Sequence, residues 1–257
     1  MRVSAIPAFR DNYIWALHSG DNSVFVVDPG AAEPVEQFLR ANGLALAGIL
    51  ITHHHADHTG GIADLCTNRN IPVYGPAGTH IKGISHPVAD TDSVHIGVAT
   101  LSVMAVPGHT LDHLAYVLDA ADGTPAVFCG DTLFAGGCGR LFEGSAEMMY
   151  TSLRRLAALP AQTRVYCAHE YTVGNLSFAL KVEPDNTALA QRYQTELEKR
   201  QQHLPTLPST ILQEQRTNPF LRCHIASIRA NVGQNMAQSL LSDVETFACL
   251  RRWKDSV

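Results

Sequence analysis

This chain of 257 residues lacks the long apolar runs and the leader segment that would place it in or across a membrane. No apolar run approaches the roughly 18 residues that a membrane-spanning helix needs. Residues 1–17 do not combine a basic start with a long apolar stretch and a small-residue cleavage site, as a secretory signal does. We therefore expect a folded, soluble protein of the cytoplasm without a membrane partner.

Positive charge is also scarce. Lys and Arg number 19 against 24 Asp and Glu, so the formal net charge is −5, and no long basic block offsets this deficit. A broad surface that contacts nucleic-acid phosphates is not expected, because such surfaces carry an excess of basic side chains. A small basic pocket is still compatible with this balance. The composition thus predicts no nucleic-acid partner.

The cysteines follow no pairing pattern. None belongs to a Cys-x-x-Cys pair of the kind that binds zinc or exchanges disulfides. In a cytoplasmic protein we expect them to be reduced and to pack in the core as small hydrophobic residues. The six are Cys66, Cys129, Cys138, Cys167, Cys223 and Cys249.

The chain does contain enough apolar material for a core, since 46% of its residues are hydrophobic and only 17% are charged. Pro34 and Gly43 mark the two ends of an amphipathic helix, and Ser145 can cap another. Apolar alternation predicts strands over residues 12–17, 23–27, 47–51, 71–75, 99–106, 113–118, 125–129 and 164–167. Asp122-Gly123 predicts a hairpin turn between the sixth and seventh of these strands.

Beyond the last of these strands the pattern becomes helical. Residues 185–202 and 236–255 place apolar side chains at helical spacing, with charges between them. The sequence therefore predicts an α/β (α+β) fold with two domains. A metal-binding catalytic domain spans residues 1–168, and a smaller all-helical, substrate-binding domain spans residues 169–257.

The predicted strands that end near Ile51, Val106, Cys129 and Cys167 each run directly into a loop with His or Asp. If these strands share a sheet with the same ends aligned, their loops meet at one edge of it. Functional residues commonly lie on such loops, because the strands behind them form a rigid scaffold. We expect the candidate functional side chains to meet at this edge.

Those loops contain the side chains that most often bind metals. Residues 52–61 read THHHADHTGG, and the later loops add two histidines and an aspartate. The candidate ligands are His53, His55, Asp57, His58, His109, Asp131 and His169. Seven nitrogen and oxygen ligands exceed the needs of one tetrahedral zinc ion, so they predict two ions that share a carboxylate. Such ligands suit zinc, manganese or iron.

The remaining histidines are expected to have other roles. Alternation places the side chain of His54 opposite those of its neighbours, so we predict that it packs or supports ligands rather than binding metal. Isolated histidines without a pattern are expected on the surface or in loops. These are His80, His86, His95, His113 and His203.

The motifs THHHADHTGG, PGHT, GDTLF and AHEYT resemble, in this order, those of the metallo-β-lactamase fold hydrolases. Within that superfamily, AGGCGRLFEG, AHEYTVGNLSFALKVEPDN, TNPFLR and RRWKD are similar to glyoxalase II, the hydroxyacylglutathione hydrolases. The resemblance covers essentially the whole chain. It implies an αββα sandwich with two metals at one edge of the sheets, followed by the smaller helical domain.

The resemblance also implies a role for each candidate ligand. His53, His55 and His109 would hold the first metal, and Asp57, His58 and His169 the second. Asp131 would bridge the two metals, and Asp57 could in addition orient the attacking hydroxide or accept its proton. Asp57 and Asp131 are thus the candidate catalytic residues.

The implied reaction is the hydrolysis of S-(D)-lactoylglutathione to D-lactate and glutathione, the second step of the glyoxalase route of methylglyoxal detoxification. A hydroxide held between the metals would attack the thioester carbonyl, and the thiolate would leave without strong acid assistance because a thiol pKa is about 8.5. Residues that match the family's glutathione site are Arg140, Phe142, Tyr171, Arg251 and Lys254. Many relatives have Lys for Arg140 and Tyr for Phe142, and Phe142 cannot donate a hydrogen bond.

Three other functions stay open from the sequence. A persulfide dioxygenase with a single iron shares much of the histidine pattern, and an RNA-processing nuclease can use the same scaffold. A non-catalytic metal-binding or glutathione-binding module is the third. The acidic net charge disfavours the nuclease, and the basic residues near the C-terminus disfavour the dioxygenase. We expect a monomer whose partner is a small glutathione thioester.

Overall fold

The computed structural model describes residues 1–20, 22–119, 123–239 and 242–257. It divides into two compact units, between which the chain passes several times. Unit 1 consists of residues 1–105, 112–130 and 166–169, and unit 2 consists of residues 106–111, 131–165 and 170–257. Each unit contains several separate segments of the chain, so the units are not two consecutive domains. The domain boundary predicted after residue 168 stays a prediction.

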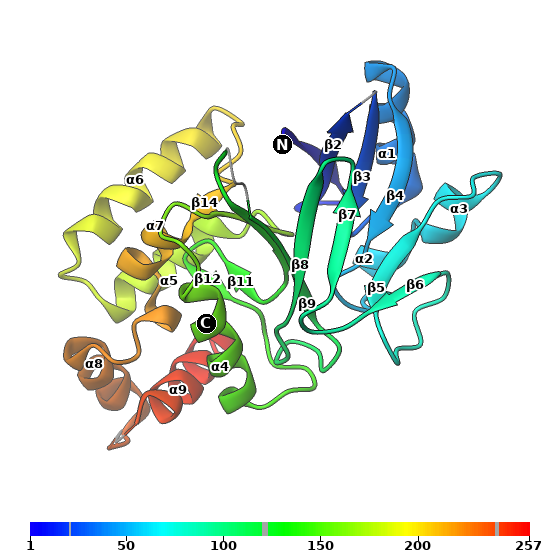
Figure 1. The fold of residues 1–257 in the computed structure, drawn as a ribbon. Helices are drawn as coiled ribbons and strands as arrows, with labels where there is room; N and C mark the ends of the chain where they lie inside the picture. The colour runs from blue at the N-terminus through cyan, green and yellow to red at the C-terminus, as the bar shows by residue number, and fades with distance from the viewer. Residues whose placement is uncertain (21, 120–122, 240–241) are drawn as a thin grey trace. The chain divides into compact units, whose positions relative to one another are not determined.

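A mixed sheet forms one layer of unit 1 (Figure 1). Its strands lie side by side in sequence order: β1 (Val3–Ala8), β2 (Asn12–Gly20), β3 (Ser23–Val27), β4 (Ala45–Leu50), β5 (Val73–Pro76) and β6 (His86–Val88). The first three strands are antiparallel, and β4, β5 and β6 continue the sheet in parallel. Parallel neighbours need crossover connections, which here contain helices α1 (Ala32–Asn42), α2 (Ala56–Thr59) and α3 (Ile62–Cys66).

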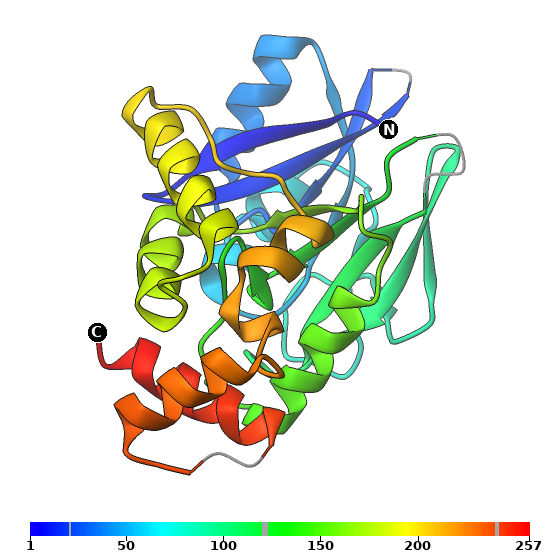
Figure 2. The same cartoon turned by 90° about the vertical axis from the view of Figure 1, so that its left-hand side faces the viewer.

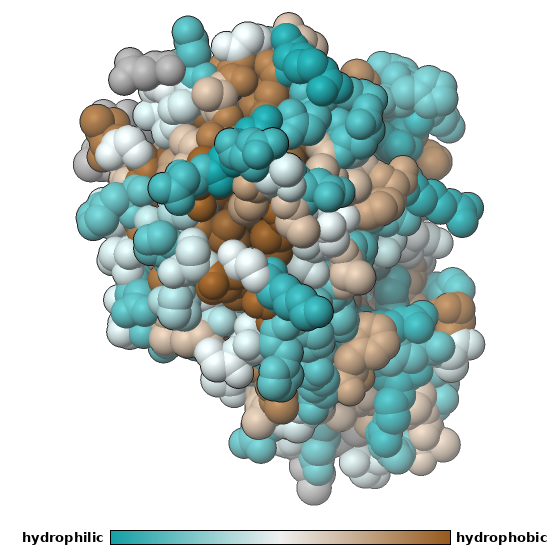
Figure 3. Space-filling model, turned by 90° about the vertical axis from the view of Figure 1, so that its right-hand side faces the viewer, coloured by the Kyte–Doolittle hydropathy of each residue, from teal (hydrophilic) through white to brown (hydrophobic). Residues whose placement is uncertain are grey.

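Helix α1 confirms the helix predicted between Pro34 and Gly43. Gly43 adopts a left-handed φ of 61°, and its N–H donates to the carbonyl groups of the last helical turn. Val35 and Leu39 are buried in the apolar core against the sheet. Figure 3 views the side on which α1 and α3 lie in Figure 1, and hydrophilic side chains cover much of this face.

The second sheet of unit 1 is antiparallel from β7 to β10. Its strands are β7 (Ser93–Ile96), β8 (Ala99–Ala105), β9 (Leu114–Leu118) and β10 (Ala126–Gly130), followed by the end of β13 (Arg164–Cys167). β9 and β10 are buried along their whole length. Asp122 of the predicted hairpin turn between them lies outside the described residues.

Hydrogen bonds join the two sheets of unit 1 directly. The Tyr116 hydroxyl donates to the Ile51 carbonyl at 2.8 Å, and the Trp15 indole donates to the Cys167 carbonyl at 3.0 Å. From the sequence, we considered that the strands preceding the candidate ligands share one sheet. In the structure they lie in two different sheets. β4 belongs to the first sheet, and β8, β10 and β13 belong to the second. The separation was invisible in the sequence because each strand has the same local pattern.

Unit 2 is mainly helical (Figure 2). Its helices are α4 (Ala146–Ala157), α5 (Thr172–Val182), α6 (Thr187–Gln201), α7 (Ile211–Thr217), the 3₁₀ turn η1 (Pro219–Leu221), α8 (Ala226–Met236) and α9 (Asp243–Asp255). Short strands accompany them: β11 (Leu133–Phe134), β12 (Gly137–Cys138) and β14 (Ser209–Thr210). The Ser145 hydroxyl caps α4 as predicted, because it accepts a hydrogen bond from the Met148 N–H.

Two predictions for the C-terminal part need correction. β14 pairs with Arg164 and Val165 of β13, so strand structure does not end with the eighth predicted strand. The helix predicted over 236–255 begins only at Asp243, since Ala237 ends α8 with a left-handed φ of 51°. Residues 240–241 lie outside the described residues. Within the described ranges, no helix is long and apolar enough to cross a membrane.

The link between the sheets gives a stability prediction. Burial keeps the pKa of Tyr116 well above its usual range, so the phenol stays protonated and donates to Ile51. Tyr116→Phe leaves that buried carbonyl without this donor and should lower the free energy of unfolding by about 1–3 kcal/mol in a urea titration. Tyr193→Phe, in α6, is the matched control and should change it by less. Equal effects of the two substitutions would contradict the prediction.

Candidate functional site

In unit 1, three predicted ligands converge where β4 and β13 end. His55 occupies the N-cap position of the short helix α2 without a side-chain cap, and Asp57 and His58 lie in the single turn of this helix. The Asp57 Oδ2 atom is 3.4 Å from His58 Nε2 and 3.6 Å from His169 Nε2. One donor atom from each residue lies within 4.8 Å of the others, a spacing that can hold a metal ion. Imidazole nitrogens with one carboxylate form a donor set typical of zinc or iron.

The outer nitrogen of each of these two histidines contacts a carboxylate. His58 Nδ1 is 3.1 Å from Asp28 Oδ2, and His169 Nδ1 is 2.9 Å from Asp11 Oδ1. Protein ligands of metals commonly show this arrangement, because the carboxylate fixes the tautomer and the ring orientation. The Asn12 amide likewise donates to Asp57 Oδ2 at 3.0 Å. The residues therefore fit a metal ion.

His53 and His55 form a second group in unit 1. His53 Nε2 is 3.1 Å from His55 Nδ1, and His53 Nδ1 is 3.0 Å from the Thr52 hydroxyl. The His53 ring is fully buried and is stacked on His113, with ring centroids 4.5 Å apart and an interplanar angle of 16°. The His54 ring instead contacts Asp112, with 3.0 Å between Nδ1 and Oδ1, and its side chain is 37% exposed.

His113 lies in the loop before β9, one of the two kinds of position expected for it, but it is not on the surface. It is fully buried and its Nδ1 lies 3.0 Å from the Leu114 carbonyl. The reason is that β9, which begins at the next residue, is buried on both faces and takes His113 into the interior. The predicted surface positions of the other histidines without a pattern are confirmed: His80, His86, His95 and His203 are exposed.

Sequence reasoning missed the residues that support the histidines. Asp28 was not among the candidates, although it follows an apolar strand just as the predicted ligands do. That shared strand-then-acid pattern was a usable signal. Asp11 lies in the turn between β1 and β2, and Asn12 is the first residue of β2, so no local pattern distinguishes either of them as a support.

In unit 2, His109 and Asp131 form a buried pair, with 3.5 Å between Nε2 and Oδ2. His109 Nδ1 is 2.9 Å from the Arg140 carbonyl, which orients the ring in the same way as the carboxylates in unit 1. Gly139 permits this close packing, since a Cβ atom there would lie 2.0 Å from the Asp131 carbonyl oxygen and 3.0 Å from His109 Nδ1.

This pair lies on the wall of a cavity of about 900 Å³ in unit 2. All the residues predicted to bind glutathione also line it: Arg140, Phe142, Tyr171, Arg251 and Lys254. Arg200 adds another cation that sequence reasoning missed, while Glu170 is an acidic member of the wall. A cavity with this excess of cations favours an anionic ligand.

The cations of the wall are held differently. Arg251 is buried, donates to the Cys138 carbonyl at 2.9 Å and to Asp255 at 2.8 Å, and lies 5.1 Å from the centre of the Phe220 ring. Burial, followed by repulsion from Arg251, lowers the pKa of Lys254 to about 8. Arg140 is exposed, and its Nε atom lies 3.6 Å from Asp255 Oδ1.

The remaining wall residues are aromatic or unreactive. The Phe142 ring lies edge-on to His109 with 5.2 Å between centroids, and Tyr171 lies edge-on to Phe134 with 5.3 Å between centroids. Burial raises the pKa of the Cys138 thiol to about 11, so this residue is protonated at neutral pH and is a poor nucleophile. All six cysteines are described, and they are free thiols.

Comparisons with known proteins give consistent matches along the chain. The model of the metallo-beta-lactamase superfamily matches residues 9–169, and that of the hydroxyacylglutathione hydrolase C-terminus matches residues 170–257. The hydroxyacylglutathione hydrolase of Alkalilimnicola ehrlichii is 53% identical over 256 residues, which cover 98% of both chains. That of Photobacterium profundum is 52% identical over 258 residues, which cover 100% of this chain and 99% of the relative.

Solved structures share the fold at lower identity. ETHE1 from Myxococcus xanthus has a TM-score of 0.68 at 24% identity, and the match covers 98% of this chain and 91% of that one. TTHA1623, solved in a di-iron-bound form, has a TM-score of 0.58 at 25% identity, with 82% of this chain and 95% of that one covered.

The contact between His58 and Asp28 yields a prediction about metal affinity. Asp28→Asn removes the carboxylate that orients the ring and should weaken zinc binding by about 10- to 100-fold. Competition with a chromophoric chelator measures this affinity on folded protein. Asp64→Asn, at an exposed position of α3, is the matched control and should bind zinc like the wild type. Unchanged affinity of the Asp28→Asn protein would show that Asp28 does not orient a ligand.

Proposed function

The chain belongs to the hydroxyacylglutathione hydrolases of the metallo-beta-lactamase superfamily, and from this membership we propose that it hydrolyses S-(D)-lactoylglutathione to D-lactate and glutathione. The resemblance and the fold class predicted from the sequence are confirmed, as a metallo-beta-lactamase domain with mixed sheets precedes a helical C-terminal part. One observation carries the proposal: a single cavity of unit 2 is lined both by the His109–Asp131 pair and by cationic side chains suited to the carboxylates of glutathione.

The fold and its His/Asp cluster imply divalent metal ions. We propose two per chain, with His53, His55 and His109 as ligands of one and Asp57, His58 and His169 as ligands of the other. Asp131 would bridge them. Zinc is the metal that we propose, with iron or manganese as alternatives, and the di-iron form of TTHA1623 supports a two-metal site. When bound, such ions lower the pKa of a shared water from about 15.7 toward about 7 and stabilise a developing oxyanion.

The side chains of the chain would then orient the reactants. Asp57, itself fixed by Asn12, can accept the proton of the attacking water. Arg251 and Lys254 would bind carboxylates of glutathione, because a buried or half-buried cation gains more from an ion pair than an exposed one does. Arg140 would complete this site from its exposed position, and Tyr171 can donate a hydrogen bond. Phe142 would provide only an apolar contact.

The thiolate leaving group needs no strong proton donor from the protein. A thiolate with a conjugate-acid pKa of about 8.5 departs without a strong proton donor. The buried, protonated Cys138 is not needed as a nucleophile, because water is the attacking group. We propose further that the protein acts as a monomer in the cytoplasm, in the second step of methylglyoxal detoxification by the glyoxalase route.

The activity itself is the first prediction to test. Purified protein should consume S-(D)-lactoylglutathione, followed through the loss of thioester absorbance, and a chelator should abolish the reaction until metal is restored. Asp131→Ala should lower kcat at least about 100-fold, because it removes a group at the reacting centre. Asp185→Ala, at an exposed position of unit 2, should retain wild-type kcat.

The assay also separates the alternative functions. No hydrolysis by metal-replete protein would overturn the thioesterase assignment. Oxygen uptake with glutathione persulfide would then favour a dioxygenase, and cleavage of RNA would favour a nuclease. Metal binding without either reaction would favour a binding module.

The lowered pKa of Lys254 predicts how binding depends on pH. Below pH 8 the amine is protonated and attracts a carboxylate, and above it the charge is lost, so kcat/KM should fall as pH rises through about 8. Lys254→Met should raise KM by about 10- to 100-fold at pH 7, the effect of losing one charge-assisted hydrogen bond, and should remove this fall. Lys181→Met, at an exposed position in the last turn of α5, is the control and should leave KM unchanged. An unchanged pH profile in Lys254→Met would exclude this role.

A further inference from the structure

The short hairpin of β11 and β12 in unit 2 is held by side chains from the helices. Each strand has only two residues, and a two-stranded hairpin is marginally stable by itself. The Asn175 amide of α5 donates to the Ala135 carbonyl at 3.1 Å. The Asn218 amide, just after α7, donates to the carbonyls of Phe134 and Gly137 at 3.2 and 2.9 Å.

The turn of the hairpin is bound by Glu214 of α7. Glu214 Oε2 accepts hydrogen bonds from the Gly136 N–H at 2.8 Å and from the Asn218 amide at 3.0 Å. Gly136 has a left-handed φ of 69°, and a Cβ atom there would approach Leu176 to 2.6 Å. The turn therefore fits between α5 and α7 in one conformation, with its amide directed at the carboxylate.

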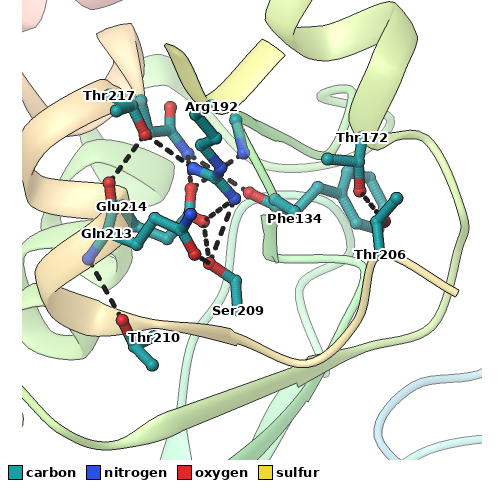
Figure 4. Close-up of polar contacts among 12 residues, drawn as sticks. Phe134, Thr172, Arg192, Thr206, Ser209, Thr210, Gln213, Glu214 and Thr217 are labelled. Atoms are coloured by element: carbon teal, nitrogen blue, oxygen red, sulfur yellow. Dashed lines mark hydrogen bonds and ion pairs between the residues drawn. The ribbon is translucent and has the colours of Figure 1, made fainter. Parts of the chain in front are cut away.

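Glu214 is in turn held by Arg192 of α6. The guanidinium donates to Glu214 Oε1 at 2.7 Å and to the Thr217 hydroxyl at 2.6 Å, and the Ser209 hydroxyl also donates to Oε1 (Figure 4). The Arg192 and Glu214 side chains are 3% and 0% exposed. A pair this deeply buried is a weak source of stability, because an apolar pair of similar volume is often equally stable. Its charge thus calls for another explanation.

The hairpin separates two residues of the proposed site. Asp131 precedes β11 by two residues, and Arg140 follows β12 by two residues. The hairpin itself places Phe134 and Cys138 on the cavity wall, and the Cys138 carbonyl accepts the hydrogen bond from Arg251. A displacement of the hairpin would therefore move groups on both sides of the cavity.

We propose that Glu214, held by Arg192, is a positioning residue for the proposed thioester hydrolysis, on which this inference rests. Its carboxylate fixes the hairpin turn through Gly136 and so sets the positions of Asp131 and of the Cys138 carbonyl that orients Arg251. It contacts no substrate. Displacements of about 1 Å in such supports can cost about 100-fold in rate.

Two double variants separate positioning from stability. Arg192→Met with Glu214→Met, the Met/Met protein, replaces the pair by apolar side chains and removes the acceptor for the Gly136 N–H. Arg192→Met with Glu214→Gln, the Met/Gln protein, also removes both charges but keeps a side-chain oxygen that can accept from the Gly136 N–H. Because neither variant leaves an unpaired buried charge, both should fold, which thermal unfolding checks.

The positioning role predicts different results for the two variants. The Met/Met protein should lose about 10- to 100-fold in kcat/KM, with lower kcat and higher KM. Its backbone amides in residues 131–140 should exchange hydrogen faster, while exchange elsewhere is unchanged. The Met/Gln protein should recover most of both properties. Arg69→Met with Glu36→Gln, which removes an ion pair of unit 1, should match the wild type in kcat/KM.

Equal kcat/KM in the Met/Met, Met/Gln and wild-type proteins would overturn the inference, as would losses that follow the melting temperature alone. Hydrogen exchange is measured without turnover, so it decides the positioning role even if the wild type fails to hydrolyse the thioester. In that case, faster exchange over residues 131–140 in the Met/Met protein alone would support the positioning role of Glu214. Identical exchange in both variants would overturn it. Failure of the proposed function is thus distinguished from failure of the inference.

Discussion

The carboxylate of Asp28 fixes the start of the histidine segment, and the candidate ligands of unit 1 depend on it. Asp28 accepts hydrogen bonds from the Thr52 N–H and hydroxyl, each at 2.7 Å, and contacts His58 at 3.1 Å. Its φ of 54° costs roughly 1–2 kcal/mol, which these hydrogen bonds offset. Asp11 and the Arg140 carbonyl orient His169 and His109 in the same way. Each of these contacts fixes the orientation of a ring, which would reduce the entropy lost if that ring binds a metal ion.

The wall of the cavity in unit 2 places two cations, Arg251 and Lys254, near each other, which is electrostatically unfavourable. A buried ammonium group is costly, and this cost appears as the lowered pKa of Lys254. Arg251 cannot lose its proton, so it is stabilised by the Cys138 carbonyl, Asp255 and the Phe220 ring. An anionic ligand would relieve the repulsion between the two cations. The two neighbouring cations on the cavity wall would therefore favour the carboxylates of the proposed substrate.

Local patterns in the sequence predicted the elements that depend on local interactions. Strand alternation, the glycine that ends α1 and the Ser145 cap require only neighbours in the chain, and these predictions were confirmed. The candidate ligands also come from local patterns, because each follows a predicted strand, and their role as ligands stays a prediction. The supports do not come from local patterns, since Asp11 meets His169 across 158 positions and Glu214 meets Gly136 across 78. Only the folded chain brings such partners together.

The hairpin also explains why the compact units and the family models divide the chain differently. Residues 133–138 lie in the part matched by the metallo-beta-lactamase model, whereas Asn175, Glu214 and Asn218 lie in the part matched by the hydroxyacylglutathione hydrolase C-terminus. These side chains satisfy the hairpin backbone, so the hairpin belongs in space to unit 2. The C-terminal segment would thus do more than supply Arg251 and Lys254. Through its contacts with the hairpin it would also fix the position of Asp131. A change in the buried polar contacts of the C-terminal segment would therefore alter kcat as well as KM.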